Sequence, residues 1–337
     1  MATVVVCHNS ADAAPATLRA LEAQLRDGDE IVAVDNASVD DTPAAVAAAT
    51  RRTRLVETGA NLGFGGGCRR GARETTADLL FFLNPDAVPA DGCLDALRAA
   101  AATHPEWGAW QALVTQAGGE RVNSAGNPVH FLGFAWAGRH DDAVAAIPSE
   151  PHAVPTASGA ALVVRREAWD AIGGFDERYF MYGEDVDLSL RLRLAGWGIG
   201  IVPAARVAHD YEFVKGDFKW FYLERNRWWT VLGTYPARLL ALLAPALVLF
   251  EVALLLAAWR GGWLRAKLRA IGAVATGLPV VLERRRMIQA GRGRSASPCT
   301  FVAALTDAMD SPFLPRIPSP VARLQHWYWR AVARLAG

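Results

Sequence analysis

Two acidic stretches of the sequence combine residue types and spacing that suit chemistry. The stretch 182–188, YGEDVDL, places three carboxylates after a glycine at the predicted start of a helix. The N-terminal end of the helix dipole stabilises the ionised form of carboxylates in a first turn. The stretch 84–86, Asn-Pro-Asp, directly follows an apolar segment that predicts a strand. A metal bound at one stretch and a general base at the other would fit this pair.

The second stretch decides between two interpretations of the first. By itself, 182–188 is equally consistent with an exposed helix start in which Asp187 pairs with Arg191. A separate carboxylate, Asp86, at the end of a predicted strand favours a functional site instead. His209, at the end of another predicted strand, is by itself more typical of a hydrogen-bonded core residue than of a metal ligand.

Apolar strands that alternate with helices must position these residues. The predicted strands are 3–6, 31–34, 54–57, 79–83 and 159–164. This alternation predicts an α/β fold, with a parallel sheet that helices cover on both faces. Ligands of such sheets bind beyond the carboxyl ends of the strands. The polar residues of 7–10, 35–42 and 84–86 fall at those ends.

The glycine-rich stretch 61–67, NLGFGGG, opens a predicted helix that carries Arg69, Arg70 and Arg73. It follows the third strand rather than the first, and its spacing differs from the dinucleotide fingerprint, which excludes a dehydrogenase. Backbone N–H groups of such a turn can still contact a ribose or phosphate. The alternative is a glycine cluster in an ordinary loop. Residues 104–158 are less regular and predict an inserted, partly β segment that covers an acceptor pocket.

Taken together and in this order, these motifs resemble family 2 glycosyltransferases over residues 1–230. The resemblance is strongest to the bacterial rhamnosyltransferase-like branch, which also includes galactofuranosyltransferases. It implies a GT-A fold, Rossmann-like with a mostly parallel sheet. It also implies a nucleotide-sugar donor, a divalent metal (Mg²⁺ or Mn²⁺) and inversion at the anomeric carbon.

The resemblance also implies roles for individual residues. Asp185 corresponds to the catalytic base and Glu184 to its neighbour, with Gly159 and Glu184 facing the acceptor. Asp86 corresponds to the last aspartate of the metal motif, and His209, the second expected metal ligand, to a histidine that in some members helps hold the metal or diphosphate. The positions that correspond to nucleotide-sugar-binding residues are Asn9, Asp35, Asn36, Asn61, Gly65, Arg69, Asn84 and Asp86.

Three positions bear on how closely the family pattern is followed. Asn84 stands where the metal motif usually has its first aspartate, so Asp86 is the main carboxylate ligand. Arg69 stands where relatives often carry an asparagine. The run Arg225-Asn226-Arg227 resembles a basic patch near the diphosphate.

The chemistry of an inverting transfer explains why two separate carboxylates are enough. The acceptor hydroxyl needs a base as it attacks the sugar's C1, and such a base contributes ~10²–10⁴-fold in rate. A metal can neutralise the charge that develops on the departing nucleoside diphosphate. A glycoside hydrolase would instead need two opposed carboxylates across the bond, one of them a proton donor.

Residues 231–337 predict a helical, membrane-associated region. The apolar run 239–259 is long enough to span a bilayer. Pro245 and Glu251 interrupt it, however, and arginines flank it on both sides. We therefore expect a helical hairpin, together with 271–282, that binds the membrane surface without crossing it. The alternative is a buried helix of a soluble subdomain or dimer interface. Residues 291–298 predict a flexible link.

The totals limit the partners. The 35 basic and 34 acidic residues leave a net charge of +1, which does not favour nucleic acid. The four cysteines lack metal-ligand spacing and fit a reducing compartment, and the chain opens without a leader segment. We expect the enzyme at the cytoplasmic face of the bacterial inner membrane. The sequence leaves open whether it forms a homo-oligomer.

The expected reaction is transfer of L-rhamnose from dTDP-L-rhamnose to a lipid-linked or growing cell-envelope glycan. Two alternatives remain: a UDP-sugar transferase, for example of galactofuranose, and a nucleotide-sugar-binding protein without catalysis. The intact carboxylates of 84–86 and 184–185 argue against the last alternative.

Overall fold

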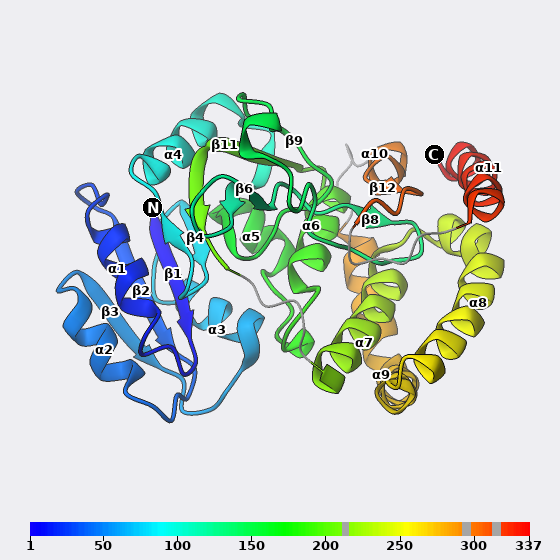
Figure 1. The fold of residues 1–337 in the computed structure, drawn as a ribbon, viewed down its shortest axis with the longest axis horizontal. Helices are drawn as coiled ribbons and strands as arrows, with labels where there is room; N and C mark the ends of the chain where they lie inside the picture. The colour runs from blue at the N-terminus through cyan, green and yellow to red at the C-terminus, as the bar shows by residue number, and fades with distance from the viewer. Residues whose placement is uncertain (211–215, 292–297, 312–317) are drawn as a thin grey trace.

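The apolar strands assemble into one mixed sheet with the order β3-β2-β1-β4-β10-β6-β11-β5, and β7 and β9 pair at its side. The structure is a computed structural model that describes residues 1–210, 216–291, 298–311 and 318–337 (Figure 1). Four neighbouring strands run parallel: β1 (Ala2–Cys7), β2 (Glu30–Asp35), β3 (Thr53–Glu57) and β4 (Leu79–Leu83). Their carboxyl ends therefore meet at one edge, as the sequence predicts.

The other half of the sheet mixes both directions. Strand β10 (Ala161–Arg165) runs antiparallel between β4 and β6 (Trp107–Thr115), and β11 (Gly198–Ala208) runs parallel to β6. The short strands of this sheet are β5 (Val88–Pro89), β7 (Val122–Ser124) and β9 (His152–Ala153). A separate two-stranded sheet pairs β8 (Val129–His130) with β12 (Leu305–Thr306).

Helices cover both faces of the sheet, as the α/β pattern predicts. One face packs against α1 (Ala14–Glu22), α2 (Thr42–Ala49) and α4 (Cys93–Thr103). The other packs against α3 (Gly63–Ala72), α5 (Arg166–Ile172) and α6 (Glu184–Leu194). Two 3₁₀ turns are η1 (Val144–Ala146) and η2 (Glu177–Tyr179). None of the cysteines forms a disulfide.

The prediction for 104–158 is partly wrong. Its first part, β6, is a central strand of the main sheet, and all nine of its residues are buried. Its scattered Gly and Trp residues hid this, because a strand buried on both faces lacks the alternation that marks a half-exposed one. The remainder forms the short strands and turns that the sequence indicates.

Five helices follow the sheet: α7 (Gly216–Thr234), α8 (Ala237–Arg260), α9 (Leu264–Ala290), α10 (Pro298–Ala303) and α11 (Ser319–Ala336). A third apolar core joins Val186 and Leu190 of α6 to Val231 of α7 and Leu239 of α8. The boundary predicted at residue 230 falls inside α7. We retain the two-part division as a proposal and place α7 with the helical region. Residues 292–297 of the predicted link lie outside the described residues.

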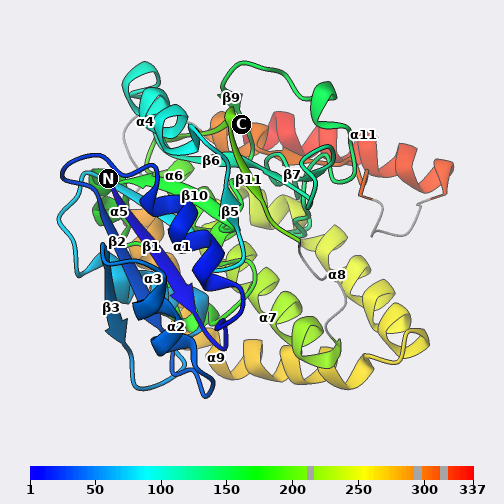
Figure 2. The ribbon, with the colours of Figure 1, turned by 60° about the vertical axis from the view of Figure 1, so that its left-hand side comes forward.

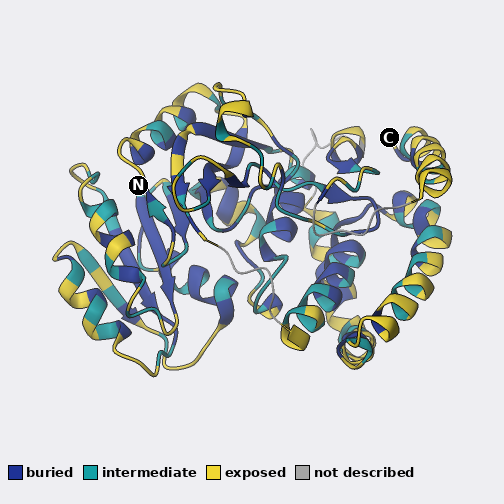
Figure 3. Ribbon diagram, viewed as in Figure 1, coloured by how far each residue is buried: buried dark blue, intermediate teal, exposed yellow. Residues whose placement is uncertain are grey.

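Helix α8 is, among the described residues, the one helix long and apolar enough to cross a bilayer. It lies with α11 at the end of the molecule away from β3 (Figures 1 and 2), and much of its surface is exposed (Figure 3). Its acidic residue, Glu251, turns inward and pairs with Arg227 of α7 and, at 2.6 Å, with Lys267 of α9. Two consecutive helices thus form where the helical hairpin is expected, and Glu251 is paired within the protein.

Candidate active site

The predicted metal ligands meet where β4 and β11 end. His209 Nε2 lies 3.2 Å from Asp86 Oδ1 and 3.4 Å from the Asn84 amide nitrogen. His209 is buried and Asp86 is half exposed, so an incoming ligand can reach the carboxylate. Within the described ranges, no third His, Cys, Asp or Glu joins them. A carboxylate and an imidazole fit a divalent cation that takes its other ligands from diphosphate oxygens and water.

Asp185 lies in the first turn of α6 and is oriented by two backbone donors. Gly159 N donates to its Oδ2 at 2.9 Å, and Val186 N donates to its Oδ1 at 2.8 Å. Burial raises the pKa of Asp185, and these two N–H groups oppose the rise. The residue as a whole is only partly buried. A carboxylate whose pKa is raised is suited to accept a proton. Gly159, predicted to face the acceptor, thus also orients Asp185, the predicted base.

Glu184 behaves differently from its neighbour, although the sequence places both at the helix start. Its side chain is buried, and its Oε2 has no hydrogen-bond partner among the described residues. Burial raises the pKa of Glu184, and the nearby Asp185 raises it further. The predicted contact of Glu184 with the acceptor is therefore not supported, because its carboxyl Oε2 is buried in the protein interior.

A short backbone path joins the predicted metal ligands to Asp185, the predicted base. Asn84 N donates to the carbonyl of Ala160 at 3.0 Å, and the preceding residue, Gly159, donates to Asp185. The end of β4 and the start of α6 are thus adjacent across the residues that precede β10. The two acidic stretches of the sequence belong to one site.

The predicted nucleoside residues gather in the loops that follow β1 and β2. Asn36 is buried, donates to Asn61 Oδ1 and to the carbonyl of Gly63, both at 3.1 Å, and accepts from Leu62 N. Its amide is thus occupied in holding the 61–63 turn, and its predicted contact with the nucleotide becomes a positioning one. Asp35, also buried, accepts from Ser38 N.

Asn9 closes the same loop cluster from the side of β1. Its Oδ1 accepts from Val39 N at 2.9 Å, and its own N–H donates to Ser38 Oγ at 3.0 Å. Asn9 and Asn61 are both exposed. Of the predicted nucleoside residues in these loops, they are the two whose side chains a ligand reaches most readily.

The glycine run forms the first turns of α3 and serves close packing. A Cβ on Gly67 would lie 2.5 Å from Val6 of β1, and one on Gly63 would lie 2.1 Å from the carbonyl oxygen of Phe180. The start of α3 is not open to phosphate as predicted, because Phe64 N donates to that carbonyl at 2.8 Å. Gly65 packs beside Phe175 rather than in the nucleotide cluster.

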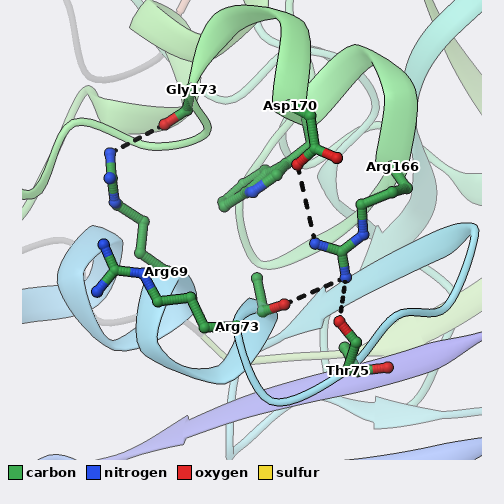
Figure 4. A pocket seen from close by; sticks show the side chains of 8 residues that line it. Arg69, Arg73, Thr75, Arg166, Asp170 and Gly173 are labelled. Atoms are coloured by element: carbon green, nitrogen blue, oxygen red, sulfur yellow. Dashed lines mark hydrogen bonds and ion pairs between the residues drawn. The ribbon is translucent and has the colours of Figure 1, made fainter.

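Arg69 is not brought to the nucleotide cluster. Its guanidinium donates to the carbonyls of Gly173 and Phe175 at 2.9 and 3.0 Å. Figure 4 shows it directed at Gly173, in a pocket that Arg73 and Arg166 also line. The predicted contact of Arg69 with the nucleotide is wrong in this structure, because its hydrogen bonds point to this other pocket.

The prediction of a basic patch at 225–227 is also wrong. Arg225 donates to the carbonyls of Arg178 and Tyr179 and lies over the ring of Trp229. Arg227 is buried, and its partners are Glu224 and Glu251. Both cations are occupied within the protein.

Asp187, two residues after Asp185, forms the pair with Arg191 that their spacing predicts. Arg191 Nε donates to it at 2.7 Å, but the pair is buried rather than exposed. Tyr179 and Arg284 of α9 also bond to Asp187. The contribution of α9 was missed, because nothing in the sequence shows which of the clustered arginines 284–286 turns inward.

Comparison with known proteins identifies the family. The model of glycosyl transferase family 2 matches residues 3–173, about half of the chain. The chain belongs to glycosyl transferase family 2. A second family model, the N-terminal domain of galactosyltransferase, matches residues 140–215 of this glycosyltransferase. The family resemblance predicted from the motifs is confirmed.

Curated relatives of this family 2 glycosyltransferase include rhamnosyltransferases. It is 37% identical over 201 residues to the N-acetylglucosaminyl-diphospho-decaprenol L-rhamnosyltransferase of Mycobacterium tuberculosis, matching 53% of this chain and 66% of that protein. It is 39% identical over 71 residues to rhamnosyltransferase WbbL of Escherichia coli, matching 21% of this chain and 26% of that protein. The chain thus covers less than two thirds of either relative.

Solved structures of glycosyltransferases share the fold. GalNAc-T7 with UDP, GalNAc and Mn²⁺ aligns with a TM-score of 0.56 and 16% identity, over 70% of this chain and 48% of that one. Staphylococcus aureus TarS with UDP-GlcNAc aligns with a TM-score of 0.51 and 15% identity, over 98% of this chain and 87% of that one. These likenesses support the predicted GT-A fold.

Proposed function

We propose that this protein is an inverting glycosyltransferase that moves L-rhamnose from dTDP-L-rhamnose to a lipid-linked glycan. The observation that carries the proposal is the convergence of Asp86 and His209 with Asp185, joined through Asn84, Ala160 and Gly159. The choice of sugar and acceptor rests on similarity to the mycobacterial rhamnosyltransferase, whose name specifies a diphospho-decaprenol carrier.

The proposed step is a single displacement. Oxygen of the acceptor hydroxyl bonds to C1 of the sugar while the bond from C1 to the diphosphate oxygen breaks. Asp185 takes the hydroxyl proton, and the bonding electrons leave with the nucleoside diphosphate. A divalent metal bound by Asp86 and His209 would act as a Lewis acid toward that leaving group. The N–H groups of Gly159 and Val186 hold the carboxylate of Asp185 in place.

Burial of Glu184 favours transfer over glycoside hydrolysis. A retaining hydrolase needs a second carboxylate about 5–5.5 Å from the first, across the scissile bond. Glu184 adjoins Asp185 in sequence but is turned into the interior, so it does not supply that group. A single displacement requires only one carboxylate as base, and Asp185 at the helix start can supply it.

We also propose that α8 and α9 hold the enzyme at the cytoplasmic face of the inner membrane without crossing it. The exposed apolar residues of α8 include Val248, Leu249, Val252 and Leu256. Glu251 lies on the same helix, and its pairs with Arg227 and Lys267 tie that part of α8 to α7 and α9. A helix that crossed the bilayer would have to leave these partners and carry the carboxylate into lipid, which is strongly unfavourable.

A donor screen tests the proposed function. The purified full chain is incubated with a synthetic prenyl-diphosphate-linked N-acetylglucosamine acceptor, Mg²⁺ or Mn²⁺, and either dTDP-L-rhamnose or UDP-galactofuranose. Mass spectrometry of the lipid product should show a deoxyhexose added only with dTDP-L-rhamnose. A hexose added only with UDP-galactofuranose would select the UDP-sugar alternative. Donor binding without product from either donor would select the non-catalytic alternative.

Vesicle flotation tests the membrane proposal. The full chain should float with vesicles of anionic phospholipid, because apolar residues and nearby arginines both attract it. A variant with Leu249→Glu and Val252→Glu should stay with the soluble fraction, since both exposed side chains lose their apolar character. Cysteine labelling from both sides of sealed vesicles would contradict the proposal if the two ends of α8 reacted from opposite sides.

A further inference from the structure

The segment Tyr179–Gly183, called the base loop below, leads directly into the helix start that carries Glu184 and Asp185. Three of its residues have left-handed backbone angles: Phe180 with φ 62°, Tyr182 with φ 68° and Gly183 with φ 80°. Only the glycine adopts such angles without strain. Each of the other two is disfavoured by about 1–3 kcal/mol, so surrounding contacts must hold the loop.

Asn226 of α7 supplies contacts of this kind. Its side chain is buried, and its Nδ2 donates to the carbonyls of Tyr179, Met181 and Tyr182 at 3.1, 2.9 and 2.6 Å. Its Oδ1 accepts from Arg225 Nε at 2.9 Å. The amide oxygen faces the Arg225 donor and the amide nitrogen faces the three carbonyls, which fixes the orientation of the amide. One side chain thus joins three backbone carbonyls of the strained loop to α7.

The base loop also determines where Asp185 lies. The carbonyl of Phe180 accepts from Phe64 N at the start of α3, and Gly183 is the residue before the first turn of α6. A Cβ on Gly183 would be 3.7 Å from the Cβ of Asn226. Asp185 follows two residues later. Movement of the loop away from Asn226 would therefore displace α6 and its carboxylate.

We propose that Asn226 is a positioning residue for transfer, because its amide holds the base loop in the conformation that presents Asp185. This proposal rests on the proposed role of Asp185 as base. An amide is the group that fits, since it offers two N–H donors to the carbonyls and one oxygen to Arg225. A carboxylate of the same shape would place negative charge against three carbonyl oxygens.

Variants of Asn226 test the proposal in the full chain. Asn226→Ala removes the donors, Asn226→Asp replaces them with acceptors, and Asn226→Ser keeps one donor. Gln289→Ala is the matched control, because Gln289 on α9 also donates to two backbone carbonyls, those of Gly233 and Thr234, outside the base loop. The measurements are hydrogen exchange of the amides of 180–185, and kcat and KM with the donor and acceptor that the wild type uses.

The expected result separates positioning from general stability. In Asn226→Ala, amides 180–185 should exchange faster while those of α9 stay protected. Its kcat should fall by about 10–10²-fold, the size expected for a small misplacement of a catalytic group. Its donor KM should stay within about twofold. Asn226→Asp should lose at least as much, Asn226→Ser should retain more kcat, and Gln289→Ala should match the wild type.

Several results would overturn the proposal. Unchanged exchange of 180–185 in Asn226→Ala would show that the amide does not hold the loop. Faster exchange with a wild-type kcat would show that the loop does not position the base. If Asn226→Ala unfolds, Asn226→Ser decides, and a wild-type kcat there would count against the proposal. A wild type that transfers no sugar would instead refute the proposed function. Hydrogen exchange of amides 180–185 would still show whether Asn226 holds the base loop.

Discussion

The two sides of the site are built in different ways. On the donor side, polar groups are held by their own neighbours in the strand-end loops: Asn36 by Asn61, and Asp35 by Ser38. On the base side, the residues on either side of Asp185 are held by residues far along the chain: Tyr179 by Asn226 of α7, and Asp187 by Arg284 of α9. The sheet domain alone contains the contacts that form the donor side. The base side requires the helical region.

The contacts of Arg284 show how strong this dependence is. It bonds to Asp187 and, at 2.6 Å, to Asp176, and all three side chains are largely buried. Charges buried together are stabilised by one another, and removing one partner leaves the others uncompensated. A fragment that ended before α8 would lack Arg284 and would leave Asp187 without that partner. The helical region is thus part of the structure around Asp185.

The largest effect is expected at the base itself. Asp185→Asn should lower transfer about 10²–10⁴-fold, because the amide keeps the shape of the side chain but cannot accept the proton. Donor binding, measured by calorimetry on the same preparation, should persist. Asp95→Asn, an exposed first-turn carboxylate of α4, is the control and should keep full activity. Near-normal transfer by Asp185→Asn would remove it from the role of base.

Arg284→Met tests, through the free energy of unfolding, whether α9 stabilises the base side. Loss of this buried cation should lower the free energy of unfolding by about 3–5 kcal/mol. Arg286→Met, an exposed position on the same helix, should change it by less than about 0.5 kcal/mol. Urea unfolding of the two variants measures the difference. Equal effects would show that α9 does not stabilise the base side through Arg284.

The effect of Arg284→Met should also depend on pH. Burial favours a raised pKa for Asp176, but Arg178 and Arg284 outweigh it and hold that pKa below its usual value. A carboxylate with a lowered folded-state pKa adds stability above its unfolded pKa, and this contribution is lost as the pH falls through the folded value. The difference between variant and wild type should therefore shrink in acid.

Asp86→Ala tests the donor side, where a smaller and more specific effect is expected. Binding of dTDP in the presence of Mn²⁺ should weaken about tenfold or more, while binding without metal changes little. The free energy of unfolding should stay near that of the wild type, since the side chain is half exposed. Asp91→Ala, an exposed aspartate nearby in sequence, is the control. An unchanged metal dependence would place the cation elsewhere.

Glu184→Gln should have the smallest effect on transfer, while its effect on stability should depend on pH. Burial raises the folded-state pKa of the Glu184 carboxyl group, so the wild type loses stability as the pH rises above the ordinary pKa of a glutamate. The amide of the variant does not ionise, so the variant should gain stability relative to the wild type between about pH 5 and pH 8. Urea unfolding at several pH values measures this gain. A constant difference across this range would argue that Glu184 is not buried as a neutral acid.

The sequence was most informative where structure is local. Strand 79–83 matched β4 and strand 3–6 fell within β1, and the spacing of Asp187 and Arg191 predicted their pair. The family resemblance, rather than local pattern, placed Asp86 together with His209, and they lie 3.2 Å apart. Apolar runs, turns and helix starts each depend on a few neighbouring residues, which the sequence shows directly.

The site residues whose predicted contacts the structure does not show share one physical origin. Asn36, Gly65 and Glu184 face the interior because of segments distant in sequence, which residue type does not reveal. Arg69 turns to Gly173 for the same reason. Conversely, Asn226 was placed near a diphosphate because two arginines flank it, and only the fold shows that all three are occupied within the protein.

The anomeric configuration of the product tests the central claim, that Asp185 acts as base in a single displacement. NMR of the sugar transferred by the wild type to a soluble acceptor analogue gives this configuration, for comparison with that of the donor. The account predicts inversion, because C1 is attacked once, from the face opposite the departing diphosphate. Retention would show that C1 is not attacked once from the face opposite the diphosphate, and it would contradict this claim.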